Sequence, residues 1–152
     1  MNKLKPQFIV WLFPFAYLIH LLDEFYLGGG FAKWYSSLLN ANLSEYDFLV
    51  INSIAIVLVI TVAILYSLGK INNFIPAVLG ILFFMNGFVH LMLSVVTWIY
   101  SPGTISGIII YIPLGVIVYK NIFPLLTQDQ RTSSIIAAIA LHILISVIAF
   151  AM

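Results

Sequence analysis

The chain alternates between long apolar runs and short segments that hold most of its polar and turn-forming residues. Several runs are about as long as the roughly 20 residues that a helix needs to cross the hydrocarbon core of a bilayer. Their apolar positions are continuous and lack the two-residue alternation of a barrel strand, so they predict helices. We therefore expect an all-α bundle of about five transmembrane helices in a single membrane domain over residues 1–152, with spans at 7–27, 48–68, 74–100, 104–124 and 133–152.

Local signals mark the ends of these expected spans. Ser44 and Asp47 have the spacing of a capping box, in which a hydroxyl and a carboxylate satisfy free amides of the first helical turn. Turn-forming residues at 69–73 and 101–104 separate the second, third and fourth runs. Pro113 is expected to kink the fourth helix near its middle, because proline removes one backbone hydrogen bond.

Composition supports the same class of protein. Hydrophobic residues make up 63% of the chain and charged residues only 7%, against about 25% charged in soluble domains. The net charge of +1, without a basic stretch, offers no surface for neutralising phosphates, so no nucleic acid is expected as a partner. The chain has no cysteine, which excludes disulfides and thiolate metal ligands. Membrane lipids are the expected surroundings.

The distribution of cations predicts the orientation of the bundle, because Lys and Arg in short loops favour the cytoplasmic side. A cytoplasmic N-terminus and an outside C-terminus leave Lys33 outside and place the other five cations inside: Lys3, Lys5, Lys70, Lys120 and Arg131. Four aromatic residues are then expected near the outer interface: Trp34, Tyr35, Trp98 and Tyr100. We expect the first run to be a retained span, because ionisable residues interrupt what would otherwise resemble a signal peptide.

Polar residues inside the expected spans are the candidates for function, because a charged residue at the bilayer centre costs about 2.5–3.5 kcal/mol on insertion scales. In the first helix, His20, Asp23 and Glu24 stand at i, i+3 and i+4, so the imidazole and at least one carboxylate share a face. In the third helix, Asn86 and His90 stand at i and i+4. Ser94 and Thr97 continue that stripe outward.

A depth estimate brings these two groups together. With a rise of about 1.5 Å per residue, His20 lies about 20 Å, Glu24 about 26 Å, Asn86 about 18 Å and His90 about 24 Å from the inner boundary. We therefore expect one polar layer in the outer half of the membrane. His142, at about 14 Å, reaches this layer only from below. Three other polar residues are weaker candidates for this layer. His142 and Tyr111 are expected to serve packing. Asn52 lies near the outer start of the second span, on the correct side of the membrane to join the polar layer.

The segment from His20 to Glu24 resembles the signature of the HXXEE proteins, a family of small, mostly bacterial integral membrane proteins of unknown function. The segments 86–90 and 100–103 are similar to the second half of the same pattern, so the resemblance covers nearly the whole chain. Asp23 stands where the family has glutamate, which keeps the charge and shortens the reach of the side chain. The resemblance implies a small integral membrane protein of the bacterial cytoplasmic membrane, without implying a reaction.

Three interpretations of the polar layer remain open. His20, Glu24 and His90, joined by Asp23 or His142, supply a nitrogen and oxygen set suited to a single zinc or iron ion. Without a metal, Glu24 or Asp23 acts as acid or base beside His20. In the third interpretation the two carboxylates end the first helix at the headgroups, and the other polar groups form interhelical hydrogen bonds worth about 0.6–2 kcal/mol each.

From these residues we expect an enzyme that acts on a lipid or another hydrophobic small molecule. Glu24 is the main acid, base or ligand, His20 and His90 are ligands or proton shuttles, Asn86 orients by hydrogen bonding, and Asp23 is secondary. A proton-coupled transporter and a non-catalytic immunity or assembly factor are the alternatives. A hydrolase of the Ser-His-Asp type is not expected, because its motifs are missing. The amphipathic segment 31–43 either covers the polar layer as a lid or rests on lipid.

Overall fold

The computed structural model describes residues 4–152, and the regular elements of this part of the chain are all helical. The long helices are α1 (Pro6–Tyr26), α3 (Glu45–Ser67), α4 (Phe74–Thr97) and α7 (Gln128–Ala151). The short helix α2 (Phe31–Leu39) joins α1 to α3. Between α4 and α7 the chain forms α5 (Thr104–Ser106), the π-helical η1 (Gly107–Tyr111), α6 (Ile112–Asn121) and the 3-10 turn η2 (Phe123–Leu125).

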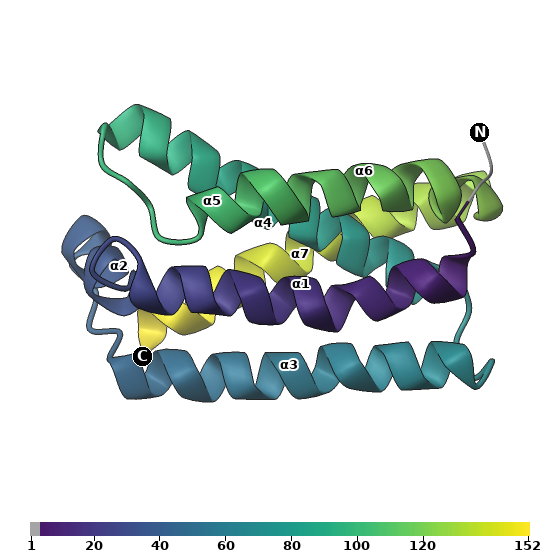
Figure 1. The fold of residues 1–152 in the computed structure, drawn as a ribbon, viewed down its shortest axis with the longest axis horizontal. Helices are drawn as coiled ribbons and strands as arrows, with labels where there is room; N and C mark the ends of the chain where they lie inside the picture. The colour runs from purple at the N-terminus through teal and green to yellow at the C-terminus, as the bar shows by residue number, and fades with distance from the viewer. Residues whose placement is uncertain (1–3) are drawn as a thin grey trace.

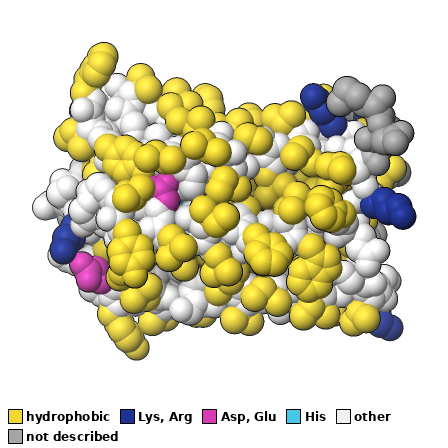
Figure 2. All heavy atoms as spheres, in the orientation of Figure 1, with side chains coloured by type: hydrophobic (Ala, Val, Ile, Leu, Met, Phe, Trp, Pro, Cys, Tyr) yellow, Lys and Arg dark blue, Asp and Glu magenta, His cyan; other side chains and the backbone are white. Residues whose placement is uncertain are grey.

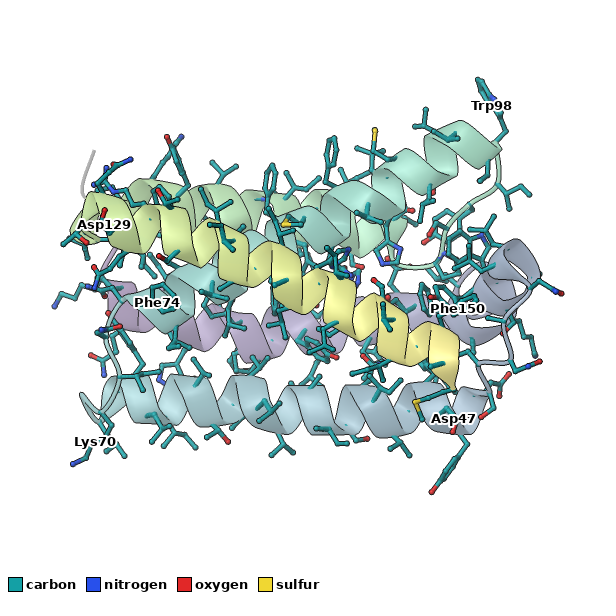
Figure 3. The ribbon with its side chains drawn as sticks, turned by 180° about the vertical axis from the view of Figure 1, so that it is seen from behind. Asp47, Lys70, Phe74, Trp98, Asp129 and Phe150 are labelled. Carbon is teal, nitrogen blue, oxygen red and sulfur yellow. The ribbon has the colours of Figure 1, made fainter. Side chains whose placement is uncertain are left out.

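Five helical segments within the described residues are long and apolar enough to cross a membrane, which confirms the number of spans predicted from the sequence. They are Pro6–Tyr26, Glu45–Ser67, Phe74–Thr97, Thr104–Leu125 and Gln128–Ala151. Successive crossings run in opposite directions, so the connections alternate between the two ends of the bundle (Figure 1). Lys70, Phe74 and Asp129 lie at one end, and Asp47, Trp98 and Phe150 lie at the other (Figure 3).

The surface of the bundle is the reverse of a soluble protein's surface. Hydrophobic side chains cover the middle of the face in Figure 2, and the Lys and Arg side chains that it shows lie at the two ends. Large aliphatic side chains such as Ile54, Val57 and Leu58 on α3 are about 60% exposed. This arrangement fits lipid as the surrounding solvent. Of the cations used to predict the orientation, Lys3 lies outside the described residues.

Small residues let the fourth crossing lie close against α4. A Cβ atom added to Gly87 would come within 2.8 Å of the Gly107 carbonyl oxygen, and one added to Gly80 would come within 2.5 Å of Val118. Close backbone approach through small residues is the common way in which membrane helices gain packing contacts. In this protein it brings the part of α4 that carries His90 next to α5.

Several helix ends differ from the predicted ones. Thr127 and Gln130 form a capping box, so α7 begins at Gln128 and not at 133. At the start of α3, Ser44 Oγ accepts from the Asp47 amide as predicted. The Asp47 carboxylate, however, accepts from the Ser44 hydroxyl rather than from its amide, so only half of the reciprocal box forms. The fourth crossing passes through η1 shortly before Pro113.

The end of α4 is the difference that shapes the site. The helix stops at Thr97 because Trp98 takes a left-handed conformation, with φ of 56°. Residues 98–103, which we call the outer loop, then leave the helix and return toward α1 before α5 begins (Figure 1). The expected span to residue 100 was therefore too long. The outer loop carries several of the side chains that surround the candidate site.

Candidate functional site

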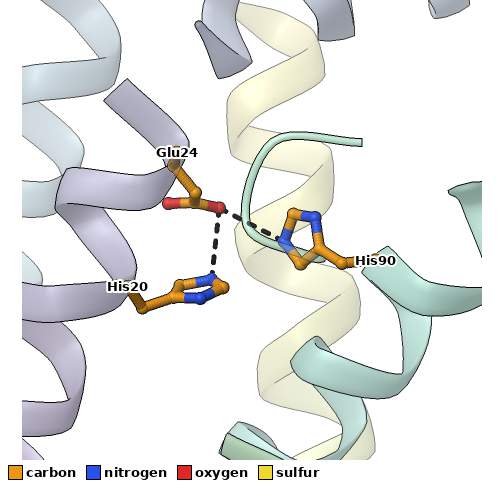
Figure 4. A group of neighbouring side chains, drawn as sticks. All are labelled: His20, Glu24 and His90. Carbon is orange, nitrogen blue, oxygen red and sulfur yellow. Dashed lines mark ion pairs between the residues drawn. The ribbon is translucent and has the colours of Figure 1, made fainter. Parts of the chain in front are cut away.

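His20 and Glu24 of α1 meet His90 of α4 inside the bundle, and we call these three residues the His–Glu centre (Figure 4). The Nε2 atom of His20 lies 3.4 Å from Glu24 Oε1, and that of His90 lies 3.2 Å from the same oxygen. The three residues are only 3%, 7% and 4% exposed for His20, Glu24 and His90 respectively. One carboxylate oxygen is therefore held between two buried imidazoles.

Two serine hydroxyls brace the imidazoles from behind. His20 Nδ1 is 2.8 Å from Ser106 Oγ, and His90 Nδ1 is 3.0 Å from Ser101 Oγ. Ser101 lies in the outer loop and Ser106 ends α5, and both are buried. Because each Nδ1 atom is engaged by a serine, each ring presents its Nε2 atom to Glu24.

The hydrogen bonds of Ser106 indicate the tautomer of His20. The Ser106 hydroxyl donates to Asp23 Oδ2 over 2.6 Å, and a hydroxyl has only one hydrogen to give. Ser106 therefore accepts from His20 Nδ1–H, which leaves a lone pair on Nε2 of the neutral ring. That atom faces the Glu24 carboxylate and has no hydrogen-bond partner among the described residues. Two electron-rich atoms thus face each other across a gap that suits a proton or a metal cation.

Asp23 serves the outer loop and not the gap between the imidazoles. Its Oδ1 accepts from the Tyr100 hydroxyl over 2.6 Å, and its Oδ2 accepts from the Ser106 amide over 2.7 Å. Partial burial and the neighbouring Asp23 carboxylate raise the pKa of Tyr100 to about 12. Tyr100, predicted as an interfacial aromatic residue, thus ties the outer loop to α1.

The backbone of the outer loop lies directly on the centre. Gly103 has φ of +98°, and a Cβ atom there would be 2.9 Å from His20 Cε1 and 3.0 Å from His90 Cε1. Ser94 Oγ accepts from the Ser101 amide over 2.8 Å, and the Thr104 hydroxyl lies 2.6 Å from the Ser101 carbonyl oxygen. A residue without a side chain is needed at Gly103 because the imidazoles occupy that space.

Aromatic rings close the remaining sides. Tyr111 stacks on His20 with ring centroids 4.0 Å apart, and it belongs to the buried core as expected. Phe31 of α2 packs edge-on against His90 with a centroid distance of 5.7 Å. Of the two alternatives for this amphipathic segment, the structure therefore supports a cover over the polar layer. Trp34 on the same helix is 8% exposed, so its side chain packs within the protein.

Only some of the predicted site residues belong to the His–Glu centre. The structure brings together His20, Glu24 and His90, as the depth estimate predicted, and one potential ligand atom from each lies within 4.8 Å of the others. Asp23 and Glu24 lie in the last turn of α1 and are each 7% exposed, so both carboxylates are surrounded by other parts of the protein. Asn86 stands one turn before His90 on α4, and its Oδ1 atom is buried without a hydrogen-bond partner among the described residues. Asn52 instead accepts from the Tyr17 hydroxyl, and His142 does not join the group.

Sequence reasoning missed the residues that brace the centre. The sequence pattern assigns Ser101 and Gly103 to a turn and to the segment that resembles the family pattern, and it gives neither them nor Thr104 and Ser106 a contact with the histidines. One signal was available: three hydroxyl residues flank a Pro-Gly turn within an otherwise apolar region. Such a concentration of hydroxyl groups between two membrane spans is a reason to expect hydrogen bonds to buried polar residues.

Comparison with known proteins adds a family. No match was found among curated proteins, and none was found among solved structures. The family model described as "Protein of unknown function with HXXEE motif" matches residues 11–118, which is more than half of the chain. The matched region contains all three residues of the His–Glu centre together with the outer loop. The chain therefore belongs to the HXXEE family, an assignment that confirms the predicted resemblance.

Proposed function

We propose that this integral membrane protein is an enzyme that acts on a lipid or another hydrophobic small molecule through the His–Glu centre. The observation that carries the proposal is the Glu24 carboxylate, which is buried between two braced imidazoles on α1, a helix long and apolar enough to cross a membrane. Such an expensive arrangement in an apolar bundle is a reason to expect a function beyond packing. We further propose a cytoplasmic N-terminus in the bacterial cytoplasmic membrane, with the centre in the outer half of the bilayer.

The centre holds the groups that acid–base or metal-assisted catalysis requires. Glu24 is the main acid, base or ligand, and His20 and His90 are ligands or proton shuttles that both contact its Oε1 atom. Asn86 stands four residues before His90 on the same face of α4, and its free Oδ1 atom is available to accept a hydrogen bond from a substrate. Asp23 acts as a positioning residue, because it holds Ser106 and Tyr100 in place.

The helix α2 provides a route for a hydrophobic substrate. Phe31 at its start covers His90, and the three glycines before it all have positive φ, at 61°, 84° and 89°. Glycine adopts such angles without steric cost, so this segment is a natural hinge. Displacement of α2 would open the centre toward the outer leaflet, where lipids and other apolar molecules concentrate.

The proposal is tested by comparing extracted lipids from cells that express the wild-type protein, Glu24→Gln or Glu45→Gln. Glu45 is the matched control, because it is an exposed carboxylate outside the His–Glu centre. Its Oε1 atom lies 3.1 Å from Lys33 Nζ. We expect a lipid or hydrophobic product that appears with the wild type and with Glu45→Gln and is lost with Glu24→Gln. The same lipid profile in all three strains and in cells without the protein contradicts an enzyme of this kind.

A continuous chain of polar contacts favours proton-coupled transport as the second candidate. It runs from Tyr100 through Asp23 and Ser106 to His20, and then through Glu24 and His90 to Ser101. Chains of this kind carry protons in pumps and transporters. Proton flux into liposomes that depends on His90 and on no added substrate would favour the transporter over the enzyme.

A further inference from the structure

We infer that the His–Glu centre binds a single zinc ion through His20 Nε2, Glu24 Oε1 and His90 Nε2. This inference deepens the proposed function, on which it rests for its biological role, by naming the cofactor of the same site. It is also testable without any knowledge of the substrate.

The distances from the two Nε2 atoms to Glu24 Oε1 are close to those of a tetrahedral zinc site, and the three ligand atoms lie within 4.8 Å of one another. Ligands bound at about 2.0–2.1 Å in tetrahedral geometry lie about 3.4 Å from one another. The two distances to Glu24 Oε1 are 3.4 Å from His20 and 3.2 Å from His90. Neighbouring ligands in an octahedral iron site would be about 3.0 Å apart. The 3.4 Å distance matches the tetrahedral value and the 3.2 Å distance lies midway between the two, so we take zinc as the ion to test.

The electronic state of the residues also calls for a cation. The Ser106 hydrogen bonds leave His20 Nε2 with a lone pair that points toward a carboxylate oxygen. This nitrogen is fully buried and lacks a hydrogen-bond partner among the described residues. A buried charge is tolerated when it is paired or bound to a metal. A zinc ion between these atoms would bind the lone pair of His20 Nε2 and neutralise the charge of the Glu24 carboxylate.

The surroundings have the second layer of contacts that metal-binding histidines normally show. A histidine that binds zinc through Nε2 usually donates its Nδ1–H to an oxygen, which fixes the ring and its tautomer. Ser106 accepts this bond from His20, and Ser101 Oγ lies 3.0 Å from His90 Nδ1, where it can do the same. Asp23 in turn holds Ser106. This Asp–Ser–His sequence of hydrogen bonds resembles the carboxylate–histidine–zinc arrangement, with a serine inserted.

The number of ligands indicates the kind of zinc site. The group contains three residues that can bind a metal, whereas structural zinc sites use four. Three protein ligands with one open position are typical of catalytic zinc, including sites with two histidines and one glutamate. The open position would accept water or a substrate oxygen, which agrees with the proposed enzyme.

The experiment measures zinc binding by the purified protein in detergent. The protein is stripped with a chelator, dialysed against zinc chloride and analysed for metal content, alongside His20→Ala, His90→Ala, Glu24→Gln and His142→Ala. His142 is the matched control, because it is a histidine within a membrane helix but outside the centre. We expect one zinc per chain in the wild type and in His142→Ala, and at least about tenfold weaker binding in the three centre variants.

Cobalt(II) substitution provides a second readout. Cobalt takes the same ligands as zinc, and its visible absorption is strong when it has four ligands and weak when it has six. We expect the strong spectrum in the wild type, its loss in Glu24→Gln and its retention in His142→Ala. Because glutamine has the volume of glutamate, Glu24→Gln keeps the test valid if either alanine variant fails to fold, as judged by size-exclusion chromatography.

The outcomes separate the zinc site from the proposed enzyme. Less than one zinc per chain after reconstitution, or zinc that survives in Glu24→Gln with an unchanged cobalt spectrum, overturns the zinc site. If lipid products still depend on Glu24 in that case, the enzyme remains and only the metal is rejected. If zinc binds as expected and no lipid change is found, the zinc site stands and the proposed function fails.

Discussion

Replacing Gly103 by alanine tests how closely the outer loop is fitted to the His–Glu centre. The added methyl group would stand 2.9 Å from His20 Cε1, 3.0 Å from His90 Cε1 and 3.1 Å from Glu24 Cγ. Separations this short force neighbouring atoms to move. The change therefore acts on all three residues of the centre at once, without removing any of their polar atoms.

The expected loss of stability has two parts. Alanine in the left-handed conformation that Gly103 adopts, at φ of +98°, costs about 1–2 kcal/mol. Inserting a methyl group into a packed interior typically costs about 1–3 kcal/mol more. Gly103→Ala should thus destabilise the protein by about 2–5 kcal/mol. The displaced imidazoles should also weaken zinc binding by about tenfold or more, since outer-shell changes alone commonly have that effect.

Gly29→Ala is the matched control. Gly29 also has positive φ, at +84°, but a Cβ atom there would have no neighbour within 4 Å. It should carry only the backbone cost of about 1–2 kcal/mol. Equilibrium unfolding in mixed micelles, followed by circular dichroism, compares the two variants with the wild type. If Gly103→Ala is no more destabilising than Gly29→Ala and leaves zinc binding unchanged, the close fit of the outer loop is refuted.

Two further predictions concern the hydrogen bonds that hold the outer loop. Ser106→Ala removes the hydroxyl between Asp23 and His20 and should lower the free energy of unfolding by about 1–3 kcal/mol. The control is Ser53→Ala, at an exposed serine, which should change it by no more than about 0.5 kcal/mol. Equal effects of the two substitutions would contradict the bracing role of Ser106. The raised pKa of Tyr100 implies stability that is present below pH 10 and lost as pH rises toward about 12. Melting temperatures across that range should fall less steeply in Tyr100→Phe than in the wild type, and parallel curves would argue against the Tyr100–Asp23 bond.

The helices and the three central residues were within reach of sequence reasoning for a physical reason. In a membrane every span must be long and apolar, so the five crossings could be predicted from hydropathy alone. The same rule makes His20, Glu24 and His90 conspicuous, and helical rise was enough to place them at one depth. Polar residues at a helix start are harder to interpret, which is why the expected fifth span begins at 133 although α7 begins at Gln128.

The bracing residues were not predictable in the same way. Ser101 and Ser106 act through a loop whose path depends on Trp98 entering the left-handed region and on the close approach of Gly87 and Gly107. Neither event has a periodic signal in the sequence. The role of Asp23 was also not predictable, because Asp23 and Glu24 stand at i+3 and i+4 from His20, and helical spacing does not say which partner each carboxylate meets. Only the packing of the outer loop separates the roles of the two carboxylates.

X-ray absorption at the zinc edge tests the central claim most directly. The sample is the purified wild-type protein reconstituted with one equivalent of zinc, beside His90→Ala. The account predicts nitrogen and oxygen ligands at about 2.0–2.1 Å, with the scattering pattern of two imidazoles in the wild type and of one imidazole in His90→Ala. A wild-type spectrum with oxygen ligands alone, or one that His90→Ala leaves unchanged, would contradict a zinc ion at the His–Glu centre.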